Sequence, residues 1–248
     1  MKGLVIIPTY NERENIAPRQ GGKRDPLRYG ILDAVHHHLP QTDILVVDDS
    51  SPDGTAGLVK KRMRKDRRLH LIEREGKLGL GTAYIRGFKW ALAHGYDYAF
   101  EMDADFSHDP RDLPRFVREI EQGADLVIGS RYIEGGAVED WPRKRKLLSY
   151  YANIYARFGT STPIKDMTAG YKCYRTEVFP RIRLEDITTD GYGFQIEIDY
   201  RVYRAGFKVV EIPICFRDRR VGVSKLNKRI VWQALFLVPK LWLWNLWR

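Results

Sequence analysis

Short apolar runs, often β-branched, alternate with longer stretches of helical periodicity along the first half of the chain. Strands are predicted at Leu4–Ile7, Ile44–Val47, Leu69–Ile72, Tyr98–Met102 and Leu126–Ile128. Helices are predicted over Thr55–Lys65, Gly81–Ala93 and Pro110–Gln122. The last of these helices is opened by Asp109 as its N-cap, with Pro110 in the first helical position. This alternation predicts an α/β sandwich with a largely parallel central sheet.

The second half of the chain is less regular. It contains a basic helix from Trp141 to about Phe158, a loop at 166–170, a helix over Phe194–Arg204 and a strand over Lys208–Ile212. Residues 17–30 carry two Pro and three Gly where a helix should follow the first strand, so we expect a surface loop or an interrupted helix there. A chain of 248 residues suits one compact domain.

The charge of the chain predicts a polyanionic partner. There are 42 Lys and Arg against 32 Asp and Glu, which gives a formal net charge of +10. Nucleic acid, anionic lipid or a phosphorylated small molecule could each be that partner.

The composition excludes other classes of protein and site. The 44% of hydrophobic residues exclude a disordered chain. Cys173 and Cys215 stand far apart, so neither a disulfide framework nor a cysteine zinc site is supported. The absence of a signal-peptide pattern after Met1 favours a cytosolic location.

Acidic and polar clusters follow three of the predicted strands. They are Pro8–Glu12, Asp48–Thr55 and Asp103-Ala104-Asp105. Because ligands gather at the carboxyl ends of parallel strands, we expect one edge of the sheet to hold all three clusters. The carboxylates of Asp103 and Asp105 suit Mg²⁺ or Mn²⁺ together with the phosphates of a nucleotide, although a solvated acidic turn would leave the same pattern. Asp48 is predicted to point inward and cap local backbone.

An enzyme that uses a nucleotide sugar needs a cation at the diphosphate, acids and aromatics for the nucleoside, and positive charge near the bond that breaks. Tyr10 could stack on a base, and Glu12 and Asp49 could accept hydrogen bonds from base or ribose. Arg131 could face the phosphates. For each residue taken alone, a structural role is the alternative.

Eight segments follow one another along the chain. In order they are PTYNE, VVDDSSPDGT, GKLGLGTAYIRG, MDADFSHDP, GSRY, DMTAGY, GYGFQIEI and IPICFRDRRVGVSKL. Together they resemble the polyprenyl-phosphate (dolichyl-phosphate) mannose synthases of glycosyltransferase family 2. The resemblance spans nearly all of residues 3–228. It implies a GT-A (Rossmann-like) fold, GDP-mannose as donor, a polyprenyl monophosphate as acceptor and Mg²⁺ or Mn²⁺ as cofactor.

The same resemblance assigns roles to residues of the donor site. It places Pro8, Tyr10, Glu12, Val47 and Asp49 at the guanosine, Asp103, Ala104 and Asp105 at the metal and diphosphate, and Arg131, Arg219 and Lys225 at the reaction centre and donor. The segment from Arg219 to Lys225 is basic and contains Gly222, so it could close over a diphosphate as the sugar leaves; a solvated basic turn is the alternative.

The acceptor phosphate is expected at Arg145 and Ser149, which stand one helical turn apart and could bind it together with Arg131. A charged helix face is the alternative. The family usually has a basic residue and a glycine after this serine, whereas this chain has Tyr150 and Tyr151. A phosphate monoester is already anionic at neutral pH, so we expect inverting transfer without a dedicated general base.

The chain ends in an apolar segment over 230–248 with four tryptophans, bracketed by basic residues. It is predicted to lie in the interface of a membrane, so that residues 1–228 form the catalytic domain and 229–248 a helical tail at the cytoplasmic face. Packing of the segment onto the domain or onto a partner is the next alternative, and a membrane span is the last. No nucleic-acid partner is expected, and a membrane partner subunit is left open. The alternatives to mannosyl transfer are glucosyl or other glycosyl transfer on the same fold, or a non-catalytic lipid-phosphate-binding role.

The tract His36–His38 is interpreted as part of a surface helix rather than a metal site.

Overall fold

The computed structural model describes residues 1–17, 30–218, 237–239 and 241. Its strands are β1 (Gly3–Thr9), β2 (Asp43–Asp48), β3 (Leu69–Glu73), β4 (Tyr98–Glu101), β5 (Leu126–Ser130), β6 (Ala137–Val138), β7 (Lys172–Arg175), β8 (Val209–Pro213) and β9 (Cys215–Phe216). Its helices are α1 (Arg13–Ile16), α2 (Ile31–His38), α3 (Thr55–Met63), α4 (Leu80–Ala93), α5 (Leu113–Glu121), α6 (Arg143–Thr160), α7 (Val178–Ile182) and α8 (Gly191–Arg204), with 3-10 turns η1 (Pro110–Asp112) and η2 (Leu184–Asp186).

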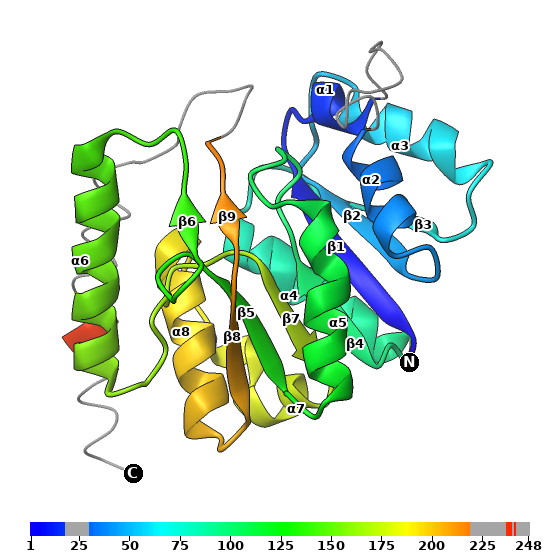
Figure 1. Cartoon of the computed structure of the whole chain (residues 1–248). Helices are drawn as coiled ribbons and strands as arrows, with labels where there is room; N and C mark the ends of the chain where they lie inside the picture. The colour runs from blue at the N-terminus through cyan, green and yellow to red at the C-terminus, as the bar shows by residue number, and fades with distance from the viewer. Residues whose placement is uncertain (18–29, 219–236, 240, 242–248) are drawn as a thin grey trace.

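A seven-stranded sheet runs through the molecule in the order β3-β2-β1-β4-β7-β5-β8 (Figure 1). Every pairing in it is parallel except those of β7, which runs antiparallel between β4 and β5. The predicted α/β sandwich with a mostly parallel sheet is confirmed. The sequence reading missed β7. A separate short ribbon pairs β6 with β9 in parallel.

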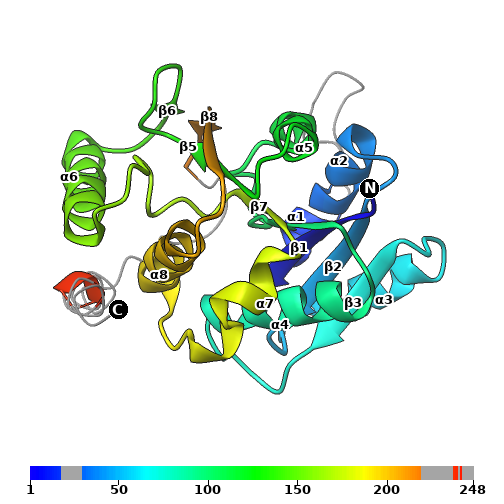
Figure 2. The same cartoon turned by 90° about the horizontal axis from the view of Figure 1, so that it is seen from below.

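Two hydrophobic cores lie on the two faces of the sheet. One is built from α4, α7 and α8 with the apolar residues of the sheet, and the other from α1, α2, α3 and α5 (Figure 2). The described part of the C-terminal segment belongs to the first core, where Leu237, Val238 and Leu241 are buried. Packing is tight where α4 crosses β1, since a Cβ added at Gly87 would stand 2.6 Å from Cγ2 of Ile6.

The predicted elements lie close to the observed ones. Asp109 accepts a hydrogen bond from the backbone N–H of Arg111 at 3.0 Å, which confirms it as a cap, although the first turn that it caps is a 3-10 turn. The basic helix predicted from Trp141 begins two residues later, after Pro142. The expected loop or interrupted helix at 17–30 falls almost wholly outside the described residues. Cys173 and Cys215 are both free thiols, the first buried and the second half-buried.

Candidate active site

The strand-end clusters predicted from the sequence meet along one edge of the sheet. β2, β1 and β4 are neighbours, and Thr9 at the end of β1 is paired in register with Asp48 at the end of β2. Asn11 donates its backbone N–H to Oγ of Ser51 at 3.0 Å, and Glu12 donates its own to Oγ1 of Thr55 at 3.1 Å. These bonds join the first cluster to the second.

Asp48 points into the structure as predicted. It is fully buried, and its carboxylate accepts from the hydroxyl of Thr9 at 2.6 Å and from the backbone N–H of Ser51 at 2.9 Å. The neighbouring Asp49 also has protein partners, because Oδ1 accepts from Nε of Arg74 at 2.5 Å and Oδ2 from the backbone N–H of Leu78 at 3.3 Å. Arg74 was not among the residues singled out from the sequence. A ligand bound at Asp49 would therefore be close to both the Asp49 carboxylate and the Arg74 guanidinium.

The remaining residues expected at the guanosine lie along the same edge. Pro8 is paired in register with Val47, whose side chain is fully buried in the core. Tyr10 is half-buried, with Nζ of Lys77 4.8 Å from its ring centroid. The carboxylate of Glu12 accepts from Nδ2 of Asn15 at 2.7 Å.

The Asp103-Ala104-Asp105 turn follows β4 directly. Ala104 and Asp105 are buried, and Oδ1 of Asp105 accepts from the backbone N–H of Ser107 at 3.0 Å. Phe106, which lies between Asp105 and Ser107, has a φ of 62°. This left-handed conformation is rare for an aromatic residue and tends to occur at functional sites. The turn is thus held in a strained shape that brings Ser107 back onto Asp105.

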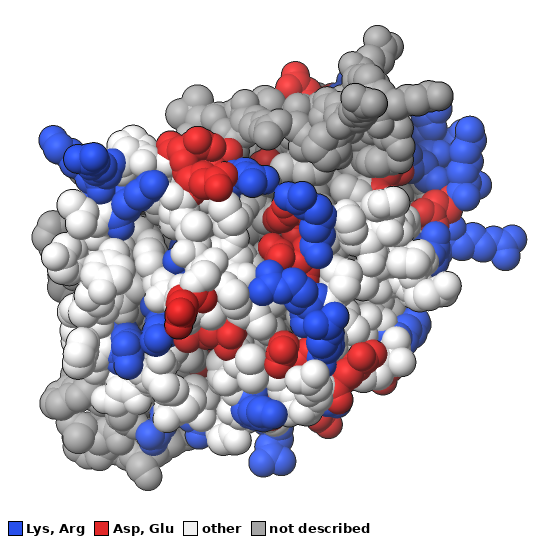
Figure 3. All heavy atoms as spheres, in the orientation of Figure 1, with Lys and Arg blue, Asp and Glu red and all other residues white. Residues whose placement is uncertain are grey.

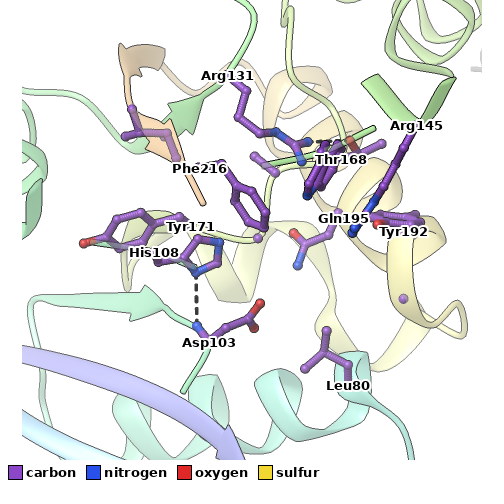
Figure 4. Close-up of a pocket in the computed structure, with 16 residues that line it drawn as sticks. Leu80, Asp103, His108, Arg131, Arg145, Thr168, Tyr171, Tyr192, Gln195 and Phe216 are labelled. Carbon is purple, nitrogen blue, oxygen red and sulfur yellow. Dashed lines mark hydrogen bonds between the residues drawn. The ribbon is translucent and has the colours of Figure 1, made fainter. Parts of the chain in front are cut away.

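His108 supports this turn from behind. Its Nδ1 accepts from the backbone N–H of Asp103 at 3.1 Å, and its ring stacks on Tyr171 with centroids 4.8 Å apart (Figure 4). Burial lowers the pKa of His108 to about 4, so the imidazole is neutral at physiological pH and able to accept that bond.

The oxygens of this turn fit a hard divalent cation. Asp103 and Asp105 supply two carboxylates, and the buried hydroxyl of Ser107 has no hydrogen-bond partner in the described part of the chain. Oxygen ligands of this kind are what Mg²⁺ and Mn²⁺ prefer. Among all the residues that the structure describes, no group of three or more His, Cys, Asp and Glu side chains is placed to hold a metal. A cation bound by Asp103 and Asp105 would therefore need ligands from a substrate as well.

Asp103 faces a pocket whose other side is basic. Arg131 and Arg145 both line it, together with Leu80, Trp141, Tyr192, Gln195 and Phe216 (Figure 4). Asp103 is expected from the sequence at the metal and diphosphate, Arg131 at the reaction centre and Arg145 at the acceptor phosphate, and the structure brings the three side chains to one pocket. Arg219 and Lys225, also expected there, lie outside the described residues.

Arg131 is held in place by Asp166, a residue to which the sequence reading gave no role. Nε of Arg131 donates to Oδ2 of Asp166 and Nη2 to Oδ1, each at 2.7 Å, and the backbone N–H of Arg131 donates to the same carboxylate. Nη2 also donates to Thr168 at 2.8 Å. Burial works against the charge of Arg131, but Asp166 outweighs it and raises the pKa of the guanidinium. A buried arginine needs an acidic partner, so the burial of Arg131 would have pointed to a residue such as Asp166. That burial could not be read from the sequence.

Arg145 stacks on Trp141. The guanidinium carbon lies 3.9 Å from the ring centroid of Trp141, and Nη1 donates to Oδ2 of Asp218 at 3.0 Å. Ser149 is half-buried one turn further along α6. Both predicted acceptor residues lie on α6, but only Arg145 lines the pocket and Ser149 does not. Trp141, to which no role was assigned from the sequence, forms an aromatic wall beside Arg145.

A buried polar network lies behind the pocket. Gln195 connects it, since Oε1 accepts from Nζ of Lys172 at 2.6 Å while Nε2 donates to Oε2 of Glu101 at 2.8 Å. Lys172 also donates to Oδ1 of Asp199 at 2.6 Å. Burial raises the pKa of Asp199 to about 8 and raises that of Glu101. The network fixes both ends of the Gln195 amide, and so fixes one wall of the pocket.

Comparison with known proteins identifies the family of this chain. A sequence profile described as glycosyl transferase family 2 matches residues 4–183. The chain belongs to glycosyltransferase family 2. It is similar to polyprenol monophosphomannose synthase of Mycolicibacterium smegmatis, with 48% identity over 96% of this chain and 85% of the relative. It is also similar to undecaprenyl-phosphate mannosyltransferase of Micrococcus luteus, with 44% identity over 97% of this chain and 93% of the relative.

Solved structures agree on the fold of this family 2 chain. Glucosyl-3-phosphoglycerate synthase from Mycobacterium tuberculosis, solved with Mn²⁺, UDP-glucose and phosphoglyceric acid, superposes with a TM-score of 0.67. The match covers 96% of this chain and 79% of that one at 16% identity. The same enzyme with Mg²⁺ and UDP gives a TM-score of 0.65. The GT-A (Rossmann-like) architecture expected from the sequence is confirmed.

The described residues contain no helix with the length and apolar character needed to cross a membrane.

Proposed function

We propose that the chain transfers mannose from GDP-mannose to the phosphate of a polyprenyl lipid, with inversion at the anomeric carbon. The observation that carries this proposal is the pocket in which Asp103 faces the guanidinium groups of Arg131 and Arg145. It offers an acidic side for a cation and a leaving diphosphate, and a basic side for an anionic acceptor. The names of the two relatives, each at least 44% identical, support mannose as the transferred sugar and a polyprenyl phosphate as the acceptor.

The donor would extend from this pocket along the edge of the sheet. Tyr10 would stack on the guanine, and Glu12 and Asp49 would accept hydrogen bonds from base or ribose. Pro8 would lie beneath the base, and Val47, whose side chain is buried in the core, would contribute only its backbone. Since Arg74 is already bound to Asp49, it would orient that carboxylate. Arg219 and Lys225 complete the proposed donor site on the side of the diphosphate.

A divalent cation, Mg²⁺ or Mn²⁺, would be held by Asp103 and Asp105, with Ala104 allowing close approach of the diphosphate. When bound, it neutralises charge that develops on the departing GDP. The chain's own part is to hold the two carboxylates in position through the strained turn at Phe106 and the bond from Asp103 to His108.

The acceptor phosphate would lie between Arg131, Arg145 and Ser149. Its oxygen carries negative charge at neutral pH, so attack on the anomeric carbon needs orientation rather than removal of a proton. Asp166 keeps the Arg131 guanidinium in one orientation, and Trp141 does the same for Arg145 through its ring. A single in-line displacement of this kind inverts the configuration of the sugar.

The soluble donor and the lipid acceptor would meet at the cytoplasmic face of a membrane. Residues 1–228 would form the catalytic domain, and 229–248 a tail at the membrane interface. The three buried apolar residues described in the tail would fasten it to the domain.

The proposal is tested by incubating the protein with Mn²⁺ or Mg²⁺, labelled GDP-mannose and a polyprenyl phosphate, and determining the anomeric configuration of the lipid product by NMR. We expect a β-linked product from the α-linked donor. Asp105→Asn should lower transfer at least about a hundredfold, because the cation supplies several kcal/mol of transition-state stabilisation. Asp186→Asn, in η2 and remote from the pocket, is the matched control. Equal activity of the two variants would refute the assignment of the metal site.

A further inference from the structure

Buried charges lie behind the pocket wall at Gln195. Figure 3 shows Lys, Arg, Asp and Glu interspersed over one face of the molecule, where solvent and salt screen their charges. Lys172 and Asp199, whose Nζ and Oδ1 atoms lie 2.6 Å apart, are fully buried instead. Because desolvation offsets the attraction within a buried pair, stability alone is a weak reason for one. This pair meets the pocket through the side-chain amide of Gln195.

The buried network allows the Gln195 amide one orientation. Oε1 accepts from Nζ of Lys172 at 2.6 Å, and an ammonium group can only donate. Nε2 donates to Oε2 of Glu101 at 2.8 Å. The reverse orientation would set an N–H against the ammonium group and an oxygen against the carboxylate. An amide nitrogen carries two hydrogens. In the described part of the chain Glu101 is the acceptor of one, which leaves the second for a ligand in the pocket.

Gly170 keeps the space beside this amide open. A Cβ added at Gly170 would lie 3.7 Å from Nε2 of Gln195 and 3.7 Å from Cε1 of His108. All three residues line the pocket. We call the part of the pocket that His108, Gly170 and Gln195 bound the Gly170 recess. Any side chain in place of the glycine would begin to fill this recess.

The Gly170 recess lies between the two ends of the pocket. In Figure 4, His108 and Gln195 lie between Asp103 and Arg131, one on each side. In the proposed function, the leaving diphosphate is held at the Asp103 end and the attacking phosphate at the Arg131 end. An in-line displacement requires the anomeric carbon to lie between the oxygen that leaves and the oxygen that attacks. The sugar ring must therefore occupy the space between the two ends.

We propose that the Gly170 recess holds the sugar of the donor and that Gln195 recognises it, by donating the second N–H of Nε2 to a hydroxyl oxygen of the sugar. This inference rests on the proposed function and adds to it the residues that select the sugar. Since the network fixes the amide before the donor binds, the bond needs no reorientation of the side chain. A sugar without that hydroxyl would leave a buried N–H unpaired, which is how a polar site rejects an analogue.

The first test combines Gln195→Met with donors that lack one hydroxyl. The ratio of kcat/KM for GDP-mannose to that for its 2-, 3-, 4- and 6-deoxy analogues is measured in turn. For one analogue the ratio should be about tenfold larger in the wild type than in Gln195→Met. The control Gln122→Met, at an exposed glutamine that follows α5, should behave like the wild type. Because each ratio is taken within one protein, a smaller folded fraction of a variant cancels. Equal ratios in the wild type and Gln195→Met for all four analogues would overturn the role of Gln195.

The second test leaves the buried network intact and decides alone if Gln195→Met does not fold. Gly170→Ala adds a methyl group at ordinary contact distance from its neighbours, so the variant should unfold at the temperature of the wild type. It should lower kcat/KM for GDP-mannose at least about tenfold, because the methyl group takes space from the sugar. Inhibition by GDP, which has no sugar, should stay unchanged. The control Gly57→Ala, at an exposed position of α3 with open space around it, should change neither value. Unchanged kcat/KM in Gly170→Ala, or an equal loss of affinity for GDP, would overturn the placement of the sugar.

The wild type shows separately whether the proposed function holds. If it transfers glucose instead of mannose, the proposed donor is wrong, but Gly170→Ala should still lower transfer from that glucose donor at least about tenfold. A Gly170→Ala variant that transfers glucose as fast as the wild type would overturn the placement of the sugar as well. If no donor is used, calorimetry with Mn²⁺ compares the binding of GDP-mannose with that of GDP. Gly170→Ala should then weaken only the binding of GDP-mannose, and equal binding by variant and wild type would overturn the proposal.

Discussion

The ion pair between Arg131 and Asp166 makes a sharp prediction about stability. Both side chains are almost completely buried, and the carboxylate accepts three hydrogen bonds from Arg131. Asp166→Asn keeps the size of the side chain and one acceptor oxygen but leaves the guanidinium without its counter-charge. Breaking a buried pair in this way costs about 3–5 kcal/mol, because desolvation of the remaining charge is uncompensated.

The assay is thermal unfolding followed by circular dichroism, at neutral pH. For a chain of this size each kcal/mol lowers Tm by about 2–4 °C, so Asp166→Asn should unfold about 6–20 °C below wild type. Asp186→Asn breaks the exposed pair with Arg183 and should cost at most about 1 kcal/mol. The double variant Arg131→Met/Asp166→Asn removes the stranded charge and should recover at least about 1 kcal/mol of the loss. If Asp166→Asn were as stable as Asp186→Asn, Asp166 would not be the partner on which Arg131 depends.

Three further predictions concern other parts of the structure. Arg145→Ala should raise the KM for the polyprenyl phosphate at least tenfold and leave the KM for the donor nearly unchanged. The measurement is steady-state kinetics with each substrate varied in turn. An equal rise in both KM values would show that Arg145 serves only the fold. Because burial raises the pKa of Asp199 to about 8, the folded chain keeps a proton there that the unfolded chain releases near pH 4, so the free energy of unfolding should fall as pH rises between these values. Denaturant titration across this range should give a flatter dependence for Asp199→Asn, and an identical slope would contradict the assignment. Gly87→Ala should destabilise by about 1–3 kcal/mol, since its Cβ would stand 2.6 Å from Ile6, and an unchanged denaturation midpoint would show that α4 can move away from β1.

The fold was largely predictable because several of its strands have a distinctive apolar sequence. β1, β2 and β5 are apolar runs buried on both faces, which read as strands without ambiguity. β7 was missed for a physical reason. Its four residues begin with Lys172, whose charge looks like a surface residue until Asp199 and Gln195 are seen to bury and pair it.

The site was predictable as a set of strand-end residues, but its internal contacts were not. Asp103, Arg131 and Arg145 were named from motifs, and the topology of the sheet brings them to one pocket. Asp166 stands in the segment DMTAGY and Trp141 at the start of the predicted basic helix, but neither residue was given a role. The bond between Arg131 and Asp166 joins residues 35 positions apart, which local patterns do not connect. Trp141 lies only four positions from Arg145, but it precedes the helix, so helical spacing did not predict their contact.

Mannosyl transfer from GDP-mannose can be measured by offering three labelled donors, GDP-mannose, GDP-glucose and UDP-glucose, in parallel to the protein with polyprenyl phosphate and Mn²⁺ or Mg²⁺. The measurement is the label extracted into organic solvent. We expect cation-dependent transfer from GDP-mannose and at least about a hundredfold less from either of the others. Equal or greater transfer from a glucose donor would contradict the proposed function, and so would the absence of transfer from all three.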